Sequence, residues 1–275
     1  MSSTREIKQR IKNIESVRQL IHGMHMVAST QLRRSGKQLE GIIPVQKELQ
    51  RKIDELAVVD ETRKFPYYEH RRVRNSLYVV FSADRGLSGS YNNRVLNFAL
   101  EEMKGKNEKV FVIGSYGYRF FQKNKKNIVQ SVIGLPDSRI YYGSENIAKA
   151  LLDLFLKRKC DEVFLVYTEF ENILLSRPKI ERILPLETRR PEPVAGTFEP
   201  SLDVYLKHLI PFYLHMTIFR AFSEAHISEQ ASRMLAMDTA GSNAEELVEK
   251  LQRNLNRQRQ QEVTQELAEI VGQRQ

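Results

Sequence analysis

Hydrophobic residues are spaced as in helices at both ends of the chain and as in strands between them. In the N-terminal segment one apolar row repeats every seven residues, at Ile7, Ile14, Ile21 and Ala28, and a companion row holds Ile11, Val17 and Met24. Two such rows are typical of a coiled coil or of a long packed helix. They predict a helix over residues 1–58, with Thr4 as candidate N-cap. We expect a kink or break near Gly41–Pro44, because an internal proline removes a backbone hydrogen bond.

The middle of the chain alternates short β-branched or aromatic runs with stretches of helical spacing. The expected strands lie at 76–82, 109–115, 127–133, 162–168 and 179–186. The expected helices lie at 92–104, 116–123 and 144–159. An order of strand, helix and strand is typical of an α/β unit with a mostly parallel sheet. Residues 75–190 are therefore predicted to form a Rossmann-like α/β domain.

From residue 202 the spacing is helical again and continues almost to Gln275. The sequence "TAGSN" at 239–243 favours a loop within this helix, since glycine weakens a helix by about 1 kcal/mol relative to alanine. The proline-rich stretch 187–201 is expected to be a loop as well. Each terminal helix has an apolar stripe that must pack against another part of the protein. Residues 1–58 and 202–275 are therefore predicted to pair as a long antiparallel coiled coil that projects from the α/β domain.

Composition adds limits to this architecture. The chain has 275 residues, a formal net charge of +9 and one cysteine, Cys160, which cannot form an internal disulfide and favours a reducing compartment. No apolar run is long enough to cross a bilayer, which takes about 20 residues, and the N-terminus lacks the apolar core of a secretion signal. The simplest interpretation is a bacterial protein in the cytoplasm or at the periphery of a membrane.

Positive charge is concentrated near the N-terminus. Residues 1–37 contain eight Lys or Arg side chains and two acids, Glu6 and Glu15. A basic helix of this kind can meet nucleic acid, an anionic membrane or an acidic protein loop, or it can be a solvated face. Charge alone leaves these alternatives open.

The stretch "YVVFSADRGLSGSYNNRVL" at 78–96 has the order strand, glycine turn, helix that is found at many phosphate sites. It lacks the Gly-Lys-Ser/Thr ending of a Walker A loop and the G-x-G-x-x-G order of a dinucleotide site. Gly86 and Gly89 are expected to allow a tight backbone turn. The similar turn in "IGSYGYR" at 113–119 is no closer to a phosphate site. No catalytic, cofactor or nucleotide site is predicted in this chain.

Motifs at both ends and in the middle of the chain resemble the γ subunit of F-type ATP synthases. The first is "REIKQRIKNIESVRQLIHGMHMVASTQLRR" at 5–34, and the second is "SADRGLSGSYN" at 82–92. The C-terminal motifs are "SEQASRMLAMDTAGSNAEELVEKL" at 228–251 and "NRQRQQEVTQELAEIVG" at 256–272. The resemblance covers essentially the whole chain.

This resemblance implies a rotor. The paired terminal helices would form a shaft within a ring of alternating α and β subunits, and the α/β domain would bind ε and the ring of membrane c subunits. Ion flow through the c ring would turn the shaft, whose asymmetric profile changes the nucleotide affinity of each β site. The chain would then be a non-catalytic, peripheral subunit on the cytoplasmic side of the bacterial membrane, held there only through the c ring.

The resemblance also implies contact residues. Those expected to meet the α/β ring are Met24, Arg33, Ser88, Arg233, Arg259, Gln260, Thr264 and Glu266. Phe198, Glu199 and Pro200 are expected to contact the c ring, with plain linker as the alternative. Polar contacts suit a shaft that must release them as it turns, because an exposed ion pair contributes only about 0–1 kcal/mol. The alternative for the polar stretch near Arg259 is a solvated helix face.

The sequence departs from the family around Met24. Gln19 and His22 stand where the family usually has lysines, and His25 follows Met24 directly. This departure puts the usual electrostatic contact there in doubt and suggests a pH-dependent one. Two histidines three residues apart can share a metal, but the sequence offers no further ligand, so no metal is predicted.

Other classes of function remain as alternatives. A basic coiled-coil nucleic-acid-binding or adapter protein would suit the net charge, but it would want stacking aromatics or a recognition helix. A Rossmann-like enzyme would need an acid, a base or a cofactor cradle at the strand ends. A γ-like subunit of a sodium-coupled ATP synthase is a further alternative, since the membrane subunits determine which ion is transported. The absence of a cysteine pair in the middle domain favours a bacterial subunit over a chloroplast one.

Overall fold

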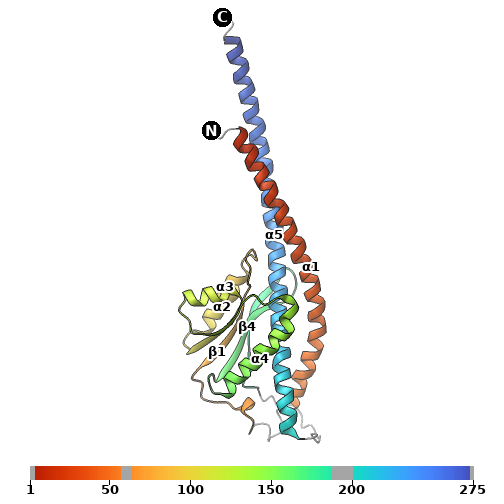
Figure 1. The fold of residues 1–275 in the computed structure, drawn as a ribbon, viewed down its shortest axis with the longest axis vertical. Coiled ribbons are helices and arrows are strands. Elements are labelled where there is room, and N and C mark those ends of the chain that lie inside the picture. The colour runs from red at the N-terminus through yellow and green to blue at the C-terminus, as the bar shows by residue number, and fades with distance from the viewer. Residues whose placement is uncertain (1–3, 57–63, 188–200, 273–275) are drawn as a thin grey trace. The chain divides into compact units, whose positions relative to one another are not determined.

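The computed structural model describes residues 4–56, 64–187 and 201–272, without the side chains of Glu266 and residues 268–272. Its longer elements, labelled in Figure 1 where there is room, are α1 (Thr4–Leu56), β1 (Ser76–Phe81), α2 (Tyr91–Glu102), β2 (Glu108–Ile113), α3 (Ser115–Lys123), β3 (Ile128–Val132), α4 (Ile140–Leu156), β4 (Glu162–Phe170), β5 (Ser176–Leu184) and α5 (Leu202–Gly272). Two single-turn helices are η2 (Pro66–Tyr68) and η3 (Asp137–Arg139).

The chain divides into two compact units, and both long helices contribute to each of them. We call residues 1–30 with 233–275 the paired-helix unit, and residues 31–232 the sheet unit.

The sheet unit is built on five strands in the order β3-β2-β1-β4-β5. Strands β1 to β4 are parallel, and β5 pairs antiparallel with β4 at the edge. Every residue of the central strand β1 is buried, with Val79 opposite Phe111 on one side and Leu165 on the other. A strand with neighbours on both edges and helices on both faces has no exposed position, which explains its unbroken apolar sequence. The predicted α/β fold with a mostly parallel sheet is confirmed.

Helices cover both faces of this sheet (Figure 1). Alternate strand residues point to opposite faces, so one strand contributes side chains to an apolar cluster on each face of the sheet. On the first face, α2 and α3 pack on the sheet through a cluster that includes Tyr78, Val80, Val95, Leu96, Val112 and Phe121. On the second face, α4 and parts of α1 and α5 pack through Leu77, Val79, Phe81, Leu151, Phe155, Ile53, Leu214 and Ile218.

The turns at the carboxyl ends of the parallel strands are held together by Asp84. Its Oδ1 accepts a hydrogen bond from the backbone N–H of Ser115 at 2.8 Å, and its Oδ2 accepts one from Gly134 at 2.9 Å. The carboxylate therefore joins the turns that follow β1, β2 and β3. Gly114 has a φ of +93°, and a Cβ there would lie 2.1 Å from the carbonyl oxygen of Ser82, so only glycine fits.

Both long helices continue without interruption, so the expected break near Pro44 and the expected loop at 239–243 were wrong. Helix α1 passes through Pro44, and α5 passes through residues 239–243. Near Pro44, Ile42 is buried in a cluster with Met216 and Phe219, and this packing offsets the one backbone hydrogen bond that proline removes. Helix α1 packs beside Gly241, where an added Cβ would lie 3.8 Å from Cγ2 of Ile21. Tertiary contacts therefore override local helix propensity at both places.

Two local expectations also change. Thr4 lies within α1, and its hydroxyl donates to the Glu262 carboxylate of α5 instead of acting only as a cap. In the turn after β1 the left-handed residues are Leu87, with φ 63°, and Gly89, with φ 55°. Gly86 instead permits a close approach, since a Cβ there would lie 2.6 Å from the Tyr116 hydroxyl.

Candidate functional site

The carboxyl ends of the parallel strands surround a cleft of about 380 Å³. The Ser82 hydroxyl donates to the carbonyl of Ile113 at 2.7 Å and accepts from the N–H of Gly117 at 2.9 Å, so it is engaged in structure. Asp84 is occupied by the two backbone N–H groups described above. These groups hold the turns in place and do not form a nucleophile and base pair.

The same cleft contains one polar cluster from other elements of the sheet unit. The Asp137 Oδ2 atom accepts from Gln31 Nε2 at 3.3 Å and lies 3.6 Å from His226 Nε2. This carboxylate thereby joins parts of α1, α5 and η3. In the part of the chain that the structure describes, no three potential ligands gather as a metal site, and no helix is long and apolar enough to cross a membrane.

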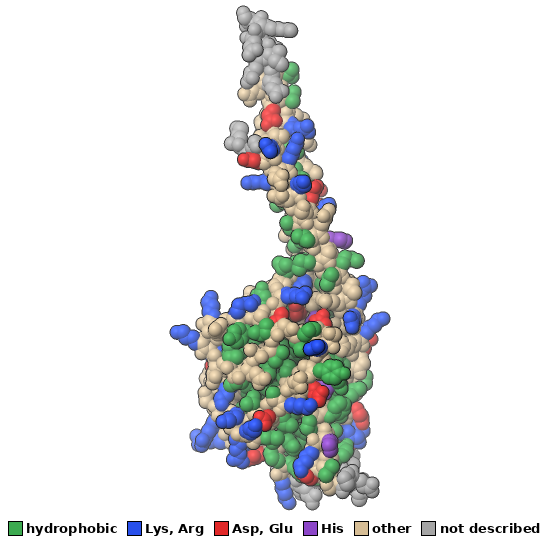
Figure 2. All heavy atoms as spheres, in the orientation of Figure 1, with side chains coloured by type: hydrophobic (Ala, Val, Ile, Leu, Met, Phe, Trp, Pro, Cys, Tyr) green, Lys and Arg blue, Asp and Glu red, His purple; other side chains and the backbone are tan. Residues whose placement is uncertain are grey.

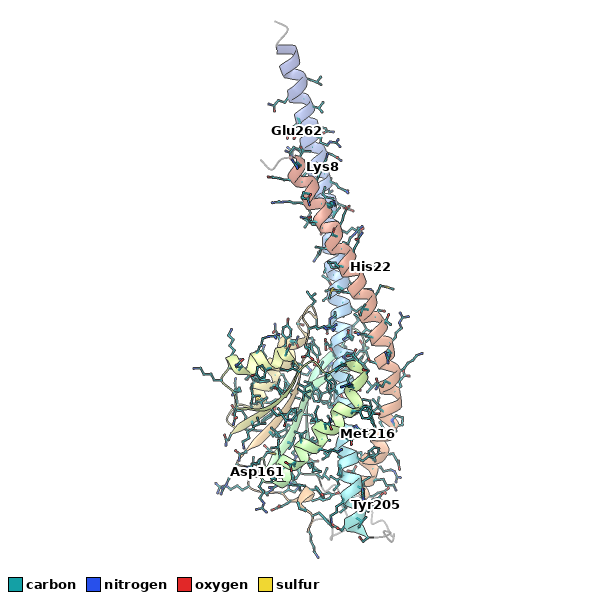
Figure 3. All side chains as sticks on the ribbon, viewed as in Figure 1. Lys8, His22, Asp161, Tyr205, Met216 and Glu262 are labelled. Carbon is teal, nitrogen blue, oxygen red and sulfur yellow. The ribbon has the colours of Figure 1, made fainter. Side chains whose placement is uncertain are left out.

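The paired-helix unit consists of antiparallel segments of α1 and α5. Thr4 contacts Glu262, Arg18 Nη1 lies 3.6 Å from Glu245 Oε1, and Ile21 lies beside Gly241. Figure 3 labels Lys8 and Glu262 on the two helices. The apolar rows of the N-terminal sequence are only partly covered, since Ile7 and Ala28 are buried whereas Val17 is 50% exposed.

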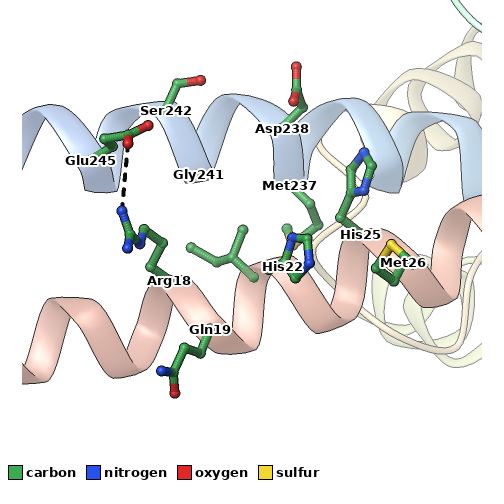
Figure 4. A pocket seen from close by; sticks show the side chains of 11 residues that line it. Arg18, Gln19, His22, His25, Met26, Met237, Asp238, Gly241, Ser242 and Glu245 are labelled. Atoms are coloured by element: carbon green, nitrogen blue, oxygen red, sulfur yellow. Dashed lines mark ion pairs between the residues drawn. The ribbon is translucent and has the colours of Figure 1, made fainter.

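A pocket of about 660 Å³ lies between these two helices, and Figure 4 shows its lining. His22 and His25 reach it from α1, and Met237 and Asp238 lie on α5. In Figure 4 the Asp238 carboxylate points away from α1, so it does not complete a ligand set with the two imidazoles. Met24, next to His25, is half-buried.

The outer surface of the paired-helix unit is mostly polar, and Figure 2 shows Lys, Arg, Asp and Glu side chains interspersed along it. Arg259, Gln260 and Thr264 are exposed and line a shallow hollow of about 440 Å³. The Thr264 hydroxyl donates to the carbonyl of Gln260 at 2.8 Å, so it is satisfied within its own helix. Among the described residues the Arg259 guanidinium forms no ion pair. The Glu266 side chain is not described.

The other predicted contact residues differ in accessibility. Arg33 is exposed, whereas the side chains of Ser88 and Arg233 are only 2% and 7% exposed. Asn92 Nδ2 donates to the Ser88 hydroxyl at 3.4 Å. A partner that approaches the loop of Ser88 would first meet its neighbour Leu87, which is 61% exposed. Phe198, Glu199 and Pro200 lie outside the described residues.

Helix α1 also presents a second apolar stripe that α5 does not cover. Its exposed members in the paired-helix unit are Val17, Leu20 and Val27, which are 50%, 68% and 57% exposed and share one side of the helix. Isolated apolar residues on a surface are ordinary, but three on one side of a helix indicate a surface that a partner covers.

Sequence reasoning missed a buried charged network in the sheet unit. Arg220 donates from Nη1 to the Tyr167 hydroxyl at 2.9 Å and to Glu224 Oε1 at 2.7 Å. Its Nη2 donates to Glu181 Oε2 at 2.5 Å. Burial raises the pKa of Glu224 and of Tyr167. The network joins α5 to β4 and β5, and the i, i+4 pair in "RAFSE" at 220–224 is the signal that could have indicated it.

Comparisons with known proteins agree with this architecture. A family model described as ATP synthase matches residues 3–274. A protein of Desulforamulus reducens called "ATP synthase gamma chain" is 36% identical over 99% of this chain and 98% of the relative. One of Brevibacillus brevis with the same name is 35% identical over 98% of this chain and 96% of its own length.

Solved structures show the same fold. A chain of the Euglena gracilis mitochondrial ATP synthase superposes with a TM-score of 0.69 at 16% identity, over 98% of this chain and 92% of that one. A chain of the Tetrahymena thermophila mitochondrial ATP synthase, from its central stalk and c ring, superposes with a TM-score of 0.63 at 20% identity. That match covers 80% of this chain and 99% of the other. The nucleic-acid-binding alternative finds no support among these proteins.

Proposed function

The chain belongs to the ATP synthase family, among relatives named gamma chains, and we propose that it is the rotating central shaft of a membrane F-type ATP synthase. In this function the paired-helix unit lies within a ring of α and β subunits, and the sheet unit binds ε and the c ring. The protein is then peripheral to the bacterial cytoplasmic membrane, on its cytoplasmic side. Ion flow through the c ring turns the shaft and so drives nucleotide release at the β sites.

The observation that carries this proposal is the paired-helix unit itself. Two chain segments more than 200 residues apart in sequence form an antiparallel pair with a mostly polar surface and an uncovered apolar stripe. A shaft needs such a surface, because contacts must form and release at each angle. The rotor angle biases each β site between states of different affinity, and nucleotide binding biases the angle in return.

The proposed ring contacts lie on α1, on α5 and in the turn after β1. Arg259, Gln260 and Thr264 offer exposed polar groups on α5, and Glu266 follows in the same helix. Met24 and Arg33 lie on α1, Arg233 lies on α5, and Ser88 lies in the turn after β1. The basic N-terminal helix would face acidic loops of the β subunits, through exposed ion pairs of about 0–1 kcal/mol each. The proposed c-ring contact remains at Phe198, Glu199 and Pro200.

We also propose that the chain is not catalytic, and that the ring subunits hold the nucleotides. The engaged states of Ser82 and Asp84 support this, since the strand-end groups that could act in catalysis serve to join turns. Calorimetry of the isolated chain with ATP is expected to show no micromolar binding.

The test of the shaft function is the variant Arg259→Ala or Gln260→Ala in the complete synthase. Each side chain is exposed, so assembly is expected to be unchanged. Coupled ATP synthesis is expected to fall about fivefold, the effect of losing one hydrogen bond of about 1 kcal/mol. Co-purification measures assembly and vesicle assays measure ATP synthesis, so an effect on coupling can be distinguished from an effect on assembly.

Arg257→Ala is the matched control, because Arg257 is an exposed arginine two residues from Arg259 that is not among the expected contacts. It should leave both assembly and synthesis unchanged. Equal losses of assembly and synthesis at Arg259, or the same loss with the control, would contradict a coupling role for this polar surface.

A further inference from the structure

The amino ends of the parallel strands carry a cluster of positive charge. Two segments form it, "EHRRVR" at 69–74, which precedes β1, and "KRKCD" at 157–161, which leads from α4 into β4. Together they contain six Lys or Arg side chains and two acids. Strands β1 and β4 are parallel neighbours, and Asp161, labelled in Figure 3, joins the segments before them. Its Oδ2 atom accepts from the backbone N–H groups of Arg74 and Asn75, each at 2.9 Å.

The acids in these two segments are already engaged, which leaves an excess of cations. Glu69 Oε2 lies 3.8 Å from Arg71 Nε, and Glu69 Oε1 lies 3.5 Å from Arg158 Nη2. Asp161 is satisfied by the two backbone N–H groups. Three exposed cations form no ion pair with any described residue: Arg72, Arg74 and Lys159. Their charge is available to an anionic partner.

Exposed apolar side chains lie among these cations. Val73, between two arginines, is 52% exposed, and Leu156, just before the Lys-Arg-Lys run, is 41% exposed. Cations next to exposed apolar groups are typical of a surface that lies on an anionic membrane, where the cations meet headgroups and the apolar groups enter the boundary beneath them. A surface for single-stranded nucleic acid would instead offer aromatic rings for stacking, whereas Phe155 at this edge is buried.

The turn after α4 has an arginine where folding alone favours glycine. The N–H of Lys159 donates to the carbonyl of Leu154 at 2.9 Å, and the N–H of Arg158 donates to the carbonyl of Phe155 at 3.0 Å. These are the bonds of a helix end that turns through a left-handed residue, usually glycine, and Arg158 has a φ of 57°. Cations do favour the carboxyl end of a helix. That effect does not explain the cations of residues 69–74, which belong to another segment.

The same edge of the sheet leads to the expected c-ring contact. Strand β5 is antiparallel to β4, so its end at Leu184 lies opposite Val163, near the start of β4. Just beyond, the N–H of Leu186 donates to the carbonyl of Tyr67 at 2.8 Å, close in sequence to the first basic segment. The chain segment that follows contains the residues expected to meet the c ring, Phe198, Glu199 and Pro200.

We call the exposed residues Arg72, Val73, Arg74, Leu156 and Lys159 the basic edge, and we propose that it binds anionic phospholipid headgroups of the membrane around the c ring. This inference rests on the proposed function, because the c ring brings the basic edge to the membrane. It adds a direct contact with lipid to the attachment through the c ring. Lipid suits a turning subunit, because headgroups exchange laterally and impose no preferred angle.

The test is the double variant Arg72→Gln with Lys159→Gln in the full chain, measured by cosedimentation with vesicles of equal parts phosphatidylglycerol and phosphatidylcholine. Binding is expected to weaken about thirtyfold, the effect of removing two cations from an anionic surface. Val73→Ser should weaken it about threefold, because less apolar surface enters the headgroup boundary. Vesicles of phosphatidylcholine alone should bind the wild-type chain far more weakly. Urea denaturation of both variants should match the wild type, because the changed side chains are exposed.

The matched control is Arg119→Gln with Arg139→Gln, which removes two exposed cations of the same unit outside the basic edge. It should leave vesicle binding nearly unchanged. Equal weakening by the control, wild-type binding by the Arg72 and Lys159 variant, or equal binding to phosphatidylcholine overturns the inference. So does a variant that binds vesicles normally but no longer co-purifies with the c ring, since the basic edge would then be a protein contact.

Failure of the proposed function gives a different result. The wild-type chain would then bind the anionic vesicles and yet fail to co-purify with α, β, ε and c subunits.

Discussion

The sheet unit and the paired-helix unit obtain their structure in different ways. The sheet unit has an apolar cluster on each face of β1, and the largest of its buried side chains are aromatic. In the described part of the paired-helix unit, the buried apolar residues are Ile7, Ala28, Met237 and Val248. Because apolar burial is the main favourable term in folding, the first unit is specified by its own core. The second leaves apolar and polar surface for partners.

Charged groups follow the same division. In the sheet unit Arg220 and Glu224 are buried and paired with each other, and Arg220 donates hydrogen bonds to Tyr167 of β4 and Glu181 of β5. In the paired-helix unit the ion pair of Arg18 and Glu245 has side chains that are 48% and 66% exposed, so it contributes roughly 0–1 kcal/mol. A buried network fixes one arrangement, whereas exposed pairs exchange easily. This difference suits a sheet unit that transmits torque and a paired-helix unit that rotates within a ring.

The largest expected effect is in the sheet core. Phe111→Ala removes a fully buried ring from β2 and should lower the free energy of unfolding by about 4 kcal/mol. Leu20→Ala, on an exposed site of α1, should change it by less than about 0.5 kcal/mol. Urea denaturation of the isolated chain, followed by circular dichroism, measures both. Similar losses at the two positions would mean that the units do not differ in the way described.

A smaller effect is expected at the charged network. Arg220→Met leaves the carboxylates of Glu181 and Glu224 without their cation and should cost about 3 kcal/mol at pH 8. Burial raises the pKa of Glu224 above its usual 4.5, so its charged form is the destabilised one. The penalty is therefore present above the raised pKa and is lost as the pH falls toward 4.5.

Denaturation of Arg220→Met at pH 8 and pH 5.5 tests the direction in which this penalty changes with pH. The variant should regain stability relative to the wild type at the lower pH. Adding Glu224→Gln in the same chain should remove most of that pH dependence. A deficit that stays constant with pH would show that packing of Arg220, and not its charge, stabilises the unit.

The sequence was sufficient to predict the helices and strands but not the contacts between them. Periodicity predicted each strand of the sheet and both terminal helices, because spacing of apolar residues reflects which face is buried. It wrongly allowed a break at Pro44 and a loop at 239–243, where packing overrides propensity. Resemblance placed Ser88 in a contact loop but could not show that its side chain is buried. The Arg220 network joins residues about 50 positions apart, and no local pattern reports such a pairing.

The smallest effect, and the most specific to the paired-helix unit, is expected from Gly241→Ala. Alanine favours the helix by about 1 kcal/mol over glycine, and its Cβ would lie 3.8 Å from Ile21 Cγ2, an ordinary contact. The variant should slow amide hydrogen exchange in residues 233–255 severalfold. Gly114→Ala, at φ +93° and 2.1 Å from a carbonyl oxygen, should instead disrupt the sheet unit. Faster exchange in Gly241→Ala would contradict this prediction. It would mean that the added methyl group disturbs the packing of α1 against α5, so that glycine is needed there for close contact between the helices.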